Sequence, residues 1–215
     1  DKLMRVKICG LTTLDTLSGA INAGAAYVGF VFYEKSPRHL SIEKASQMAK
    51  AVPEGICKTA LVVDPTDNDL DLLLDKIPVD MIQLHGHESA ERVSEVKDKF
   101  GLPVMKAVGI SDESDLIHLN EYSRISDQIL VDAKPSKNSI LPGGNGLSFD
   151  WRLLAGRRWA TPWMLAGGLN PDNLIEAAKL TGATQFDVSS GVETSSGVKD
   201  IKLISDFIQA ANGEL

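Results

Sequence analysis

The sequence has little cysteine, no long apolar run and no excess of basic residues. Its 215 residues include only two cysteines, Cys9 and Cys57, so a disulfide scaffold is excluded and a reducing, cytoplasmic location is expected. No run of about 18 apolar residues occurs, so we expect no membrane partner. Lys and Arg number 22 against 29 Asp and Glu, and this formal net charge of −7 argues against a nucleic-acid partner.

The remaining composition is that of an ordinary globular protein. Apolar residues make up 43% of the chain and charged residues 24%, which is enough apolar material to build a core. No linker or shift in composition divides the chain. We therefore expect one domain over residues 1–215.

Short apolar runs alternate with amphipathic stretches along the whole chain. Strands are predicted at residues 6–9, 27–32, 58–63, 81–84, 104–108, 128–132, 163–166 and 185–188. Helices are predicted at residues 12–23, 42–52, 67–76, 88–100, 112–122, 149–158, 171–180 and 200–211. This alternation predicts parallel strands joined by right-handed crossovers. A doubly wound open sheet also fits, but eight units favour a single α/β domain with the (β/α)8 TIM-barrel fold, and no Gly-x-Gly-x-x-Gly follows the first strand.

Polar side chains occupy alternate positions in several predicted strands. If their apolar neighbours face the helices, these residues point into the barrel: Lys7, Cys9, Gln83, His85, Asp132, Asp187 and, by the same alternation, Lys106. Several stand at the carboxyl ends of their strands, where this fold builds its active sites. Burying a lone charge costs several kcal/mol, so we expect these groups either to form ion pairs or to take part in binding or catalysis. The alternative to a site is an internal ion pair, such as Lys7 with Asp187, that only sets the strand register.

Three glycine-rich segments, at residues 142–146, 166–170 and 189–193, follow the last three predicted strands. Glycine lets backbone N–H groups approach an anion closely, and the loops after strands seven and eight are the usual phosphate site of this fold. The candidate phosphate-binding residues are Gly143, Gly144, Gly167, Gly168, Ser190 and Gly191. The alternative is ordinary turn chemistry, which uses the same residue types. No spacing of His, Cys and carboxylates suggests a metal ligand set.

Motifs over most of the chain resemble the phosphoribosylanthranilate isomerase family. They are KICGLT at 7–12, GFVF at 29–32, SPR at 36–38, QLHG at 83–86, VDAK at 131–134, AGGL at 166–169 and DVSSGVE at 187–193. The resemblance implies an isomerase of tryptophan biosynthesis that needs no cofactor. Its reaction is the Amadori rearrangement of N-(5-phosphoribosyl)anthranilate to 1-(2-carboxyphenylamino)-1-deoxyribulose 5-phosphate, so the expected partner is that small-molecule substrate. We expect a monomer or a homodimer.

The resemblance also assigns roles to individual residues. Cys9 matches the general base, Asp132 the general acid, and Arg38 the residue that holds the anthranilate carboxylate. His85 and Asp187, from the inward-facing set, are taken as substrate-binding residues. We further predict that the Lys7 ammonium lowers the pKa of the Cys9 thiol.

Two other functions stay open at this stage. One is a different sugar-phosphate isomerase on the same barrel, which would use carboxylates as both acid and base; Cys9 argues against it. The other is a non-catalytic phosphate-binding barrel, which the combination of Cys9, Asp132 and Arg38 argues against.

Overall fold

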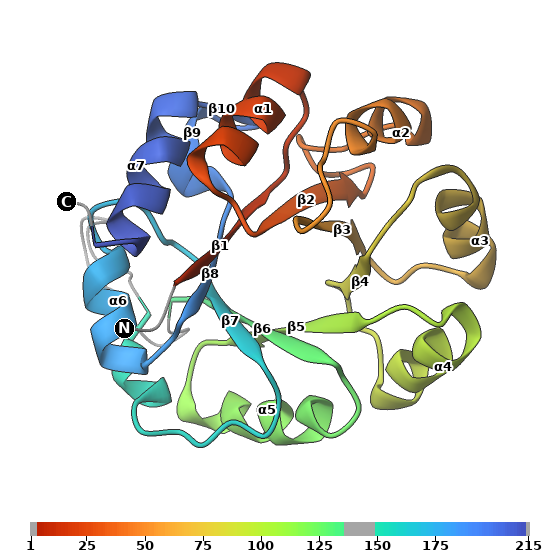
Figure 1. The fold of residues 1–215 in the computed structure, drawn as a ribbon. Helices are drawn as coiled ribbons and strands as arrows, with labels where there is room; N and C mark the ends of the chain where they lie inside the picture. Colours follow the sequence, from red (N-terminus) through yellow and green to blue (C-terminus); the bar gives the residue numbers. More distant parts are fainter. Residues whose placement is uncertain (1–3, 136–148, 214–215) are drawn as a thin grey trace.

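The strands pair in chain order, from β1 to β8 and back to β1, and so close a parallel barrel (Figure 1). The computed structural model describes residues 4–135 and 149–213. The barrel strands are β1 Arg5–Cys9, β2 Tyr27–Phe32, β3 Cys57–Val62, β4 Met81–Leu84, β5 Val104–Ile110, β6 Gln128–Ala133, β7 Trp163–Ala166 and β8 Gln185–Val188. The predicted fold class, a (β/α)8 barrel, is therefore confirmed.

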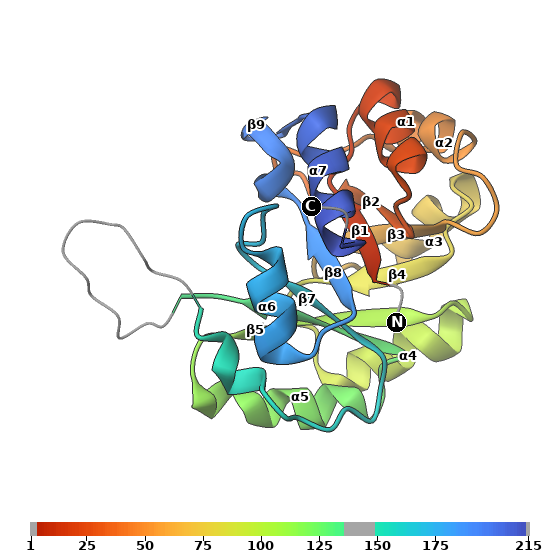
Figure 2. The same ribbon diagram turned by 60° about the vertical axis from the view of Figure 1, so that its left-hand side comes forward.

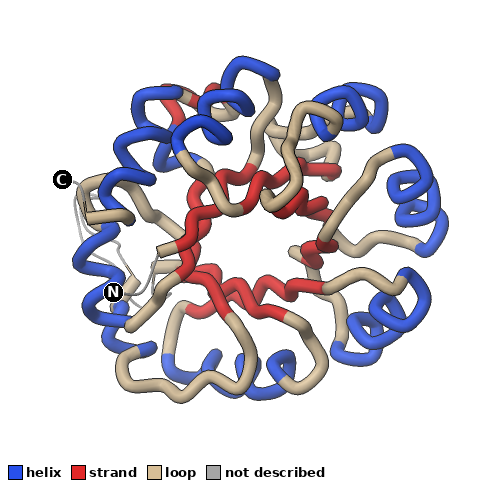
Figure 3. Tube along the Cα trace, viewed as in Figure 1, coloured by secondary structure: helices blue, strands red, loops and turns tan. Residues whose placement is uncertain are grey.

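Helices surround the strands as an outer ring (Figure 3). The α-helices are α1 Leu14–Ala23, α2 Ile42–Ala49, α3 Asp67–Lys76, α4 Ala90–Phe100, α5 Leu116–Ser123, α6 Leu174–Thr181 and α7 Ile201–Ala211. Five of them begin after a side chain that accepts a hydrogen bond from the first turn: Thr13, Ser41, Thr66, Ser89 and Asp200. Across the described residues, no helix has both the length and the apolar character needed to cross a membrane.

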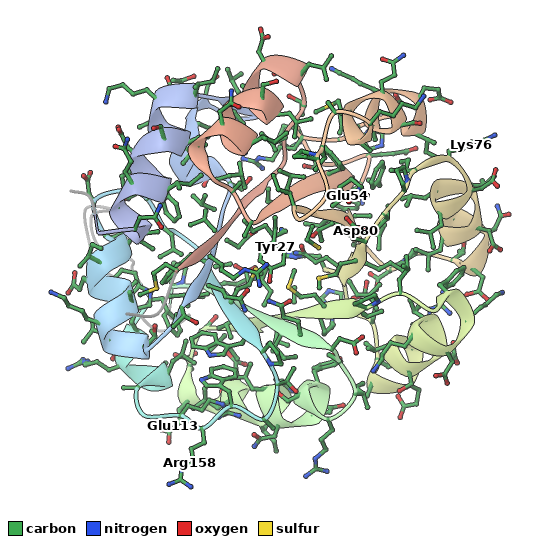
Figure 4. The ribbon with its side chains drawn as sticks, in the orientation of Figure 1. Tyr27, Glu54, Lys76, Asp80, Glu113 and Arg158 are labelled. Carbon is green, nitrogen blue, oxygen red and sulfur yellow. The ribbon has the colours of Figure 1, made fainter. Side chains whose placement is uncertain are left out.

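Two apolar clusters hold the barrel together. The larger lies between strands and helices and includes Ile8, Ile82 and Phe207. The smaller fills the barrel interior with residues from β2 and β4 to β7, namely Tyr27, Met81, Met105, Ala107, Leu130, Met164 and Ala166. Tyr27 lies near the barrel axis, whereas Lys76 and Arg158 project from the periphery (Figure 4). Apolar side chains thus fill the barrel interior toward the amino ends of the strands, and polar residues lie toward the carboxyl ends.

The predicted inward orientation of Lys106 is wrong. Met105 and Ala107 belong to the interior cluster, so Lys106 between them faces the helices. There its ammonium lies 2.7 Å from the Glu88 carboxylate, and both side chains are buried. Both faces of β5 carry apolar residues next to Lys106, namely Val104 and Val108 on its own face and Met105 and Ala107 on the other. The alternation of polar and apolar residues therefore could not show which face points inward.

Two segments between elements also differ from the sequence prediction. The helix expected at 149–158 is only a short 3₁₀ turn, η2 Trp151–Leu154, followed by irregular chain. A small hairpin, β9 Glu193–Ser195 with β10 Val198–Lys199, was not predicted; it follows β8 and precedes α7 in the chain. Strand β9 lies beside α7 (Figure 2). Two further 3₁₀ turns, η1 Glu113–Asp115 and η3 Ser190–Val192, precede α5 and β9. The hairpin contributes to the site because it carries Glu193, which contacts Arg38, and Lys199.

Candidate active site

A cavity of about 680 Å³ opens at the carboxyl ends of the barrel strands. The predicted site residues that line it are Cys9, Arg38, His85, Asp132, Asp187, Gly167, Gly168, Ser190 and Gly191. Lys7 lies beneath the cavity and is fully buried. Gly143 and Gly144 lie outside the described residues. The structure therefore brings residues from three strands and four loops to one hollow.

Cys9, the last residue of β1, stands next to a buried ion pair. The Lys7 ammonium donates a 2.7 Å hydrogen bond to Asp187 of the neighbouring strand β8. Burial by itself would lower the pKa of Lys7, but the Asp187 carboxylate outweighs it and raises that pKa, so Lys7 is a cation. The internal ion pair considered from the sequence is thus present, and it lies against the cavity rather than away from it.

Burial raises the pKa of the Cys9 thiol above its ordinary value. The Lys7 ammonium acts in the opposite direction, and so does Lys199, but neither outweighs the loss of solvation. The two lysines therefore oppose the effect of burial on this pKa without reversing it. The second cysteine, Cys57, begins β3 at the opposite end of the barrel and is half-buried.

Asp132 lies near the end of β6, with one carboxylate oxygen 3.7 Å from Nε2 of His85. His85 directly follows β4, and its Nδ1 lies 2.9 Å from Nε2 of Gln83. The exposed Lys134 ammonium also approaches Asp132, at 3.8 Å. Asp132 and His85 keep 25% and 32% of their side-chain surface accessible, so the pair faces the cavity and not the core.

Arg38, in the loop after β2, is held by a carboxylate that sequence reasoning missed. Its Nε and Nη2 atoms donate to the two oxygens of Glu193 at 2.8 and 2.6 Å, a bidentate geometry. Glu193 also accepts from Lys199 at 2.6 Å. Although burial alone would raise the pKa of Glu193, Arg38 and Lys199 hold it at about 2. The signal was Glu193 at the end of the DVSSGVE motif, but only the hairpin shows that it reaches Arg38.

The loops after β7 and β8 pack together through glycine. Gly167 has a φ of 100° and Gly168 one of 66°, a region that other residues rarely adopt. A Cβ on Gly167 would collide with the Ala133 backbone, and one on Gly191 with the Leu169 backbone. These contacts require glycine and bring the two loops together at the edge of the cavity. Among the described residues, no three His, Cys, Asp or Glu side chains are arranged to hold a metal ion.

Comparison with known proteins identifies the family. The profile of N-(5'phosphoribosyl)anthranilate (PRA) isomerase matches residues 6–210. The chain belongs to this family. Its relative in Cereibacter sphaeroides, an N-(5'-phosphoribosyl)anthranilate isomerase, is 59% identical over 208 residues, which cover 97% of this chain and 98% of that one. The expected enzyme class, an isomerase, is confirmed with the family.

Solved structures of the family have the same fold. The phosphoribosyl anthranilate isomerase of Thermotoga maritima superposes with a TM-score of 0.86 at 35% identity, over 98% of this chain and 100% of that one. A second structure of such an enzyme, solved with reduced 1-(o-carboxyphenylamino)-1-deoxyribulose 5-phosphate, gives a TM-score of 0.84 at 32% identity over the same shares.

Proposed function

We propose that this protein converts N-(5-phosphoribosyl)anthranilate to 1-(2-carboxyphenylamino)-1-deoxyribulose 5-phosphate in tryptophan biosynthesis, with Cys9 as general base and Asp132 as general acid. The observation that carries the proposal is that these two residues, from β1 and β6, line one cavity whose other edge is the glycine-rich β7 and β8 loops. A sulfur and a carboxyl group thus lie at the two sides of a space that admits a sugar phosphate.

The first step opens the ribose ring. The Asp132 carboxyl group donates a proton to the ring oxygen as the bond between C1′ and that oxygen breaks. The nitrogen lone pair then forms a C1′=N double bond, which leaves a protonated Schiff base and a carboxylate on Asp132. A carboxyl group open to the cavity can take up the proton that this step needs when substrate covers it and displaces water.

The second step moves a proton from carbon. The Schiff base acidifies the C2′–H. The Cys9 thiol first releases its own proton to solvent, and the resulting thiolate removes the C2′ proton while the electron pair forms C1′=C2′. Proton return at C1′ and loss of the proton from the C2′ hydroxyl give the ketone, so the product is an isomer of the substrate and no cofactor takes part. The Lys7 ammonium beside Cys9 supplies the positive charge that stabilises the thiolate during this step.

The two anionic ends of the substrate have separate places. We assign the phosphate to backbone N–H groups of the Gly167, Gly168, Ser190 and Gly191 loops, which are the usual phosphate loops of this fold. The anthranilate carboxylate is assigned to Arg38, whose guanidinium is fixed in orientation by Glu193. His85 and Asp187 then face the sugar hydroxyls. The free thiols fit a reducing, cytoplasmic compartment.

Steady-state kinetics of Cys9→Ala and Asp132→Asn with N-(5-phosphoribosyl)anthranilate tests the proposal. Each variant should lose roughly 10²–10⁴-fold in kcat with little change in KM, because each removes one proton-transfer group. Cys57→Ala, at the opposite end of the barrel, and Asp75→Asn, with its side chain 73% exposed, are the matched controls and should keep wild-type kinetics. An intact kcat with a raised KM would show that Cys9 and Asp132 bind substrate without transferring protons.

A further inference from the structure

Gln83 is a buried polar residue that the mechanism above does not use. It lies in β4 with 1% of its surface exposed, between Leu61 of β3 and Met105 of β5 in the strand register. Its Nε2 is 2.9 Å from Nδ1 of His85, and its Oε1 is buried without a hydrogen-bond partner among the described residues. A buried amide with an unpartnered oxygen costs stability, so its single hydrogen bond, to His85, calls for an explanation.

The contacts on the two sides of the His85 ring agree on one tautomer. A neutral imidazole carries one N–H and one bare nitrogen. The Asp132 oxygen, 3.7 Å from Nε2, favours the N–H on that atom. Nδ1 is then bare, and it accepts the hydrogen bond that the Gln83 amide N–H donates. When Asp132 is ionised, as it is after it has given up its proton, the opposite tautomer would turn a bare nitrogen toward a carboxylate, which is repulsive.

We propose that Gln83 is a positioning residue that holds His85 as its Nε2–H tautomer, aimed at Asp132. The inference rests on the proposed role of Asp132 as the acid. When Asp132 gives its proton to the ring oxygen it becomes negative, and an N–H directed at it stabilises that charge as it forms. Lys134 also approaches this carboxylate, but its side chain is 57% exposed, so solvent weakens its effect. Gln83 also lines the cavity, and in this proposal it acts on the chemistry through its hydrogen bond to His85.

Imidazole nitrogen shifts test the tautomer directly. In ¹⁵N-histidine-labelled protein at alkaline pH, where histidine side chains are generally neutral, the His85 spectrum should show a protonated Nε2 and a bare Nδ1. The signals are assigned by their loss in His85→Gln. Gln83→Leu should give a mixture of tautomers, and Gln83→Glu, which offers only acceptor oxygens, should move the proton to Nδ1. A protonated Nδ1 in the wild type, or an unchanged tautomer in both variants, would overturn the proposal.

Kinetics then separates positioning from simple packing. Gln83→Leu should lower kcat about tenfold, the effect of one hydrogen bond, with KM nearly unchanged. The matched control is Gln128→Leu, because Gln128 is another buried glutamine on the interior face with an unpartnered amide atom. It should leave both the His85 spectrum and kcat unchanged. If the tautomer switches but kcat stays at the wild-type value, Gln83 has no part in the reaction and the inference fails.

The two hypotheses fail in different measurements. The nitrogen shifts report on His85 whatever Asp132 does. If Asp132 is not the general acid, the Asp132→Asn variant keeps the wild-type kcat.

Discussion

The Cys9 thiol is subject to opposing effects from a small set of neighbours. Burial raises its pKa, Lys7 lowers it, and Asp187, 2.7 Å from Lys7, raises it again. Replacing Lys7 by Met removes the larger of the two lowering effects and leaves burial, Asp187 and the smaller effect of Lys199. We therefore predict that the thiolate of Lys7→Met forms at higher pH than in the wild type, as measured by ultraviolet absorbance during a pH titration.

The titration is best made in a Cys57→Ala background, so that Cys9 is the only thiol. A second variant, Lys7→Met with Asp187→Asn, removes both members of the ion pair and keeps the test valid if an unpaired Asp187 perturbs folding. Its midpoint should lie below that of Lys7→Met alone, because the negative charge is also gone. A midpoint equal to the wild type in Lys7→Met would show that Lys7 does not tune the thiol.

Arg38 owes its fixed orientation to Glu193. Substitution of Glu193 by Gln keeps the shape of the side chain but removes the charge that holds the guanidinium. We predict that KM rises roughly tenfold while kcat changes little, since one charge-assisted hydrogen bond of about 1.5 kcal/mol is lost from a binding group. Asp150→Asn, which breaks a similar but exposed bidentate pair with Arg152, should leave both constants unchanged. A fall in kcat at constant KM would place Glu193 in the chemical step instead.

At the scale of elements, the buried Lys106–Glu88 ion pair connects strand β5 to the segments that follow β3 and β4. Glu88 accepts hydrogen bonds from the backbone N–H of Asp64 after β3 and of Gly86 after β4, and from Lys106 of β5. Lys106 also donates to the Gly86 carbonyl. This pair therefore fixes the backbone that carries His85, and it does so from the helix side of the barrel.

The loss of Lys106 should be costly for that reason. Lys106→Met leaves the Glu88 carboxylate buried without its cation, and breaking such a pair costs about 3–5 kcal/mol of unfolding free energy. Lys202→Met, which breaks the exposed pair with Asp206 in α7, should leave the unfolding free energy nearly unchanged, because solvent screens that pair. Urea unfolding of the two variants beside the wild type measures both values. Equal stabilities would mean that Glu88 is solvated or protonated in the folded protein.

The elements that the sequence predicted well are those with local signals. Strands β2, β4, β7 and β8 and helix α3 have the predicted bounds, because apolar runs and caps such as Thr66 are read within a few residues. The expected helix at 149–158 is wrong: in the long connection from β6 to β7 the apolar residues there form only the η2 turn. The Lys106 orientation failed because its partner Glu88 is 18 residues away.

The site was predictable only in part for the same reason. Cys9, His85 and Asp132 stand out by alternation within single strands, and the cavity does bring them together. The Arg38 to Glu193 pair spans 155 residues and depends on a hairpin with no strong local pattern. Alternation within strands was enough to suggest the Lys7–Asp187 pair, whereas the Arg38–Glu193 pair depends on how the loops after β2 and β8 meet, which no local pattern indicates.

For the whole molecule, the buried carboxylates set the response to acid. The pKa of Glu193 falls from about 4.5, the ordinary value for glutamate, to about 2 on folding, because Arg38 and Lys199 outweigh the burial that would raise it. Burial would also raise the pKa of Glu88, but Lys106 lowers it. A carboxyl group with a depressed folded pKa contributes stability that is fully present above its unfolded pKa. That contribution is lost as the pH falls toward the folded value.

We therefore predict that the unfolding free energy is nearly constant from pH 7 to about pH 5 and then declines steeply between about pH 4.5 and 2. Glu193→Gln should be less stable than the wild type at pH 7, and its decline should be shallower because position 193 no longer titrates. The difference between the two proteins should shrink as the pH approaches 2. Urea unfolding at a series of pH values measures both curves, with Asp75→Asn, whose side chain is 73% exposed, as a surface control that follows the wild type. Parallel curves for wild type and Glu193→Gln would show that the Glu193 carboxylate gains no proton-linked stability from its two cations.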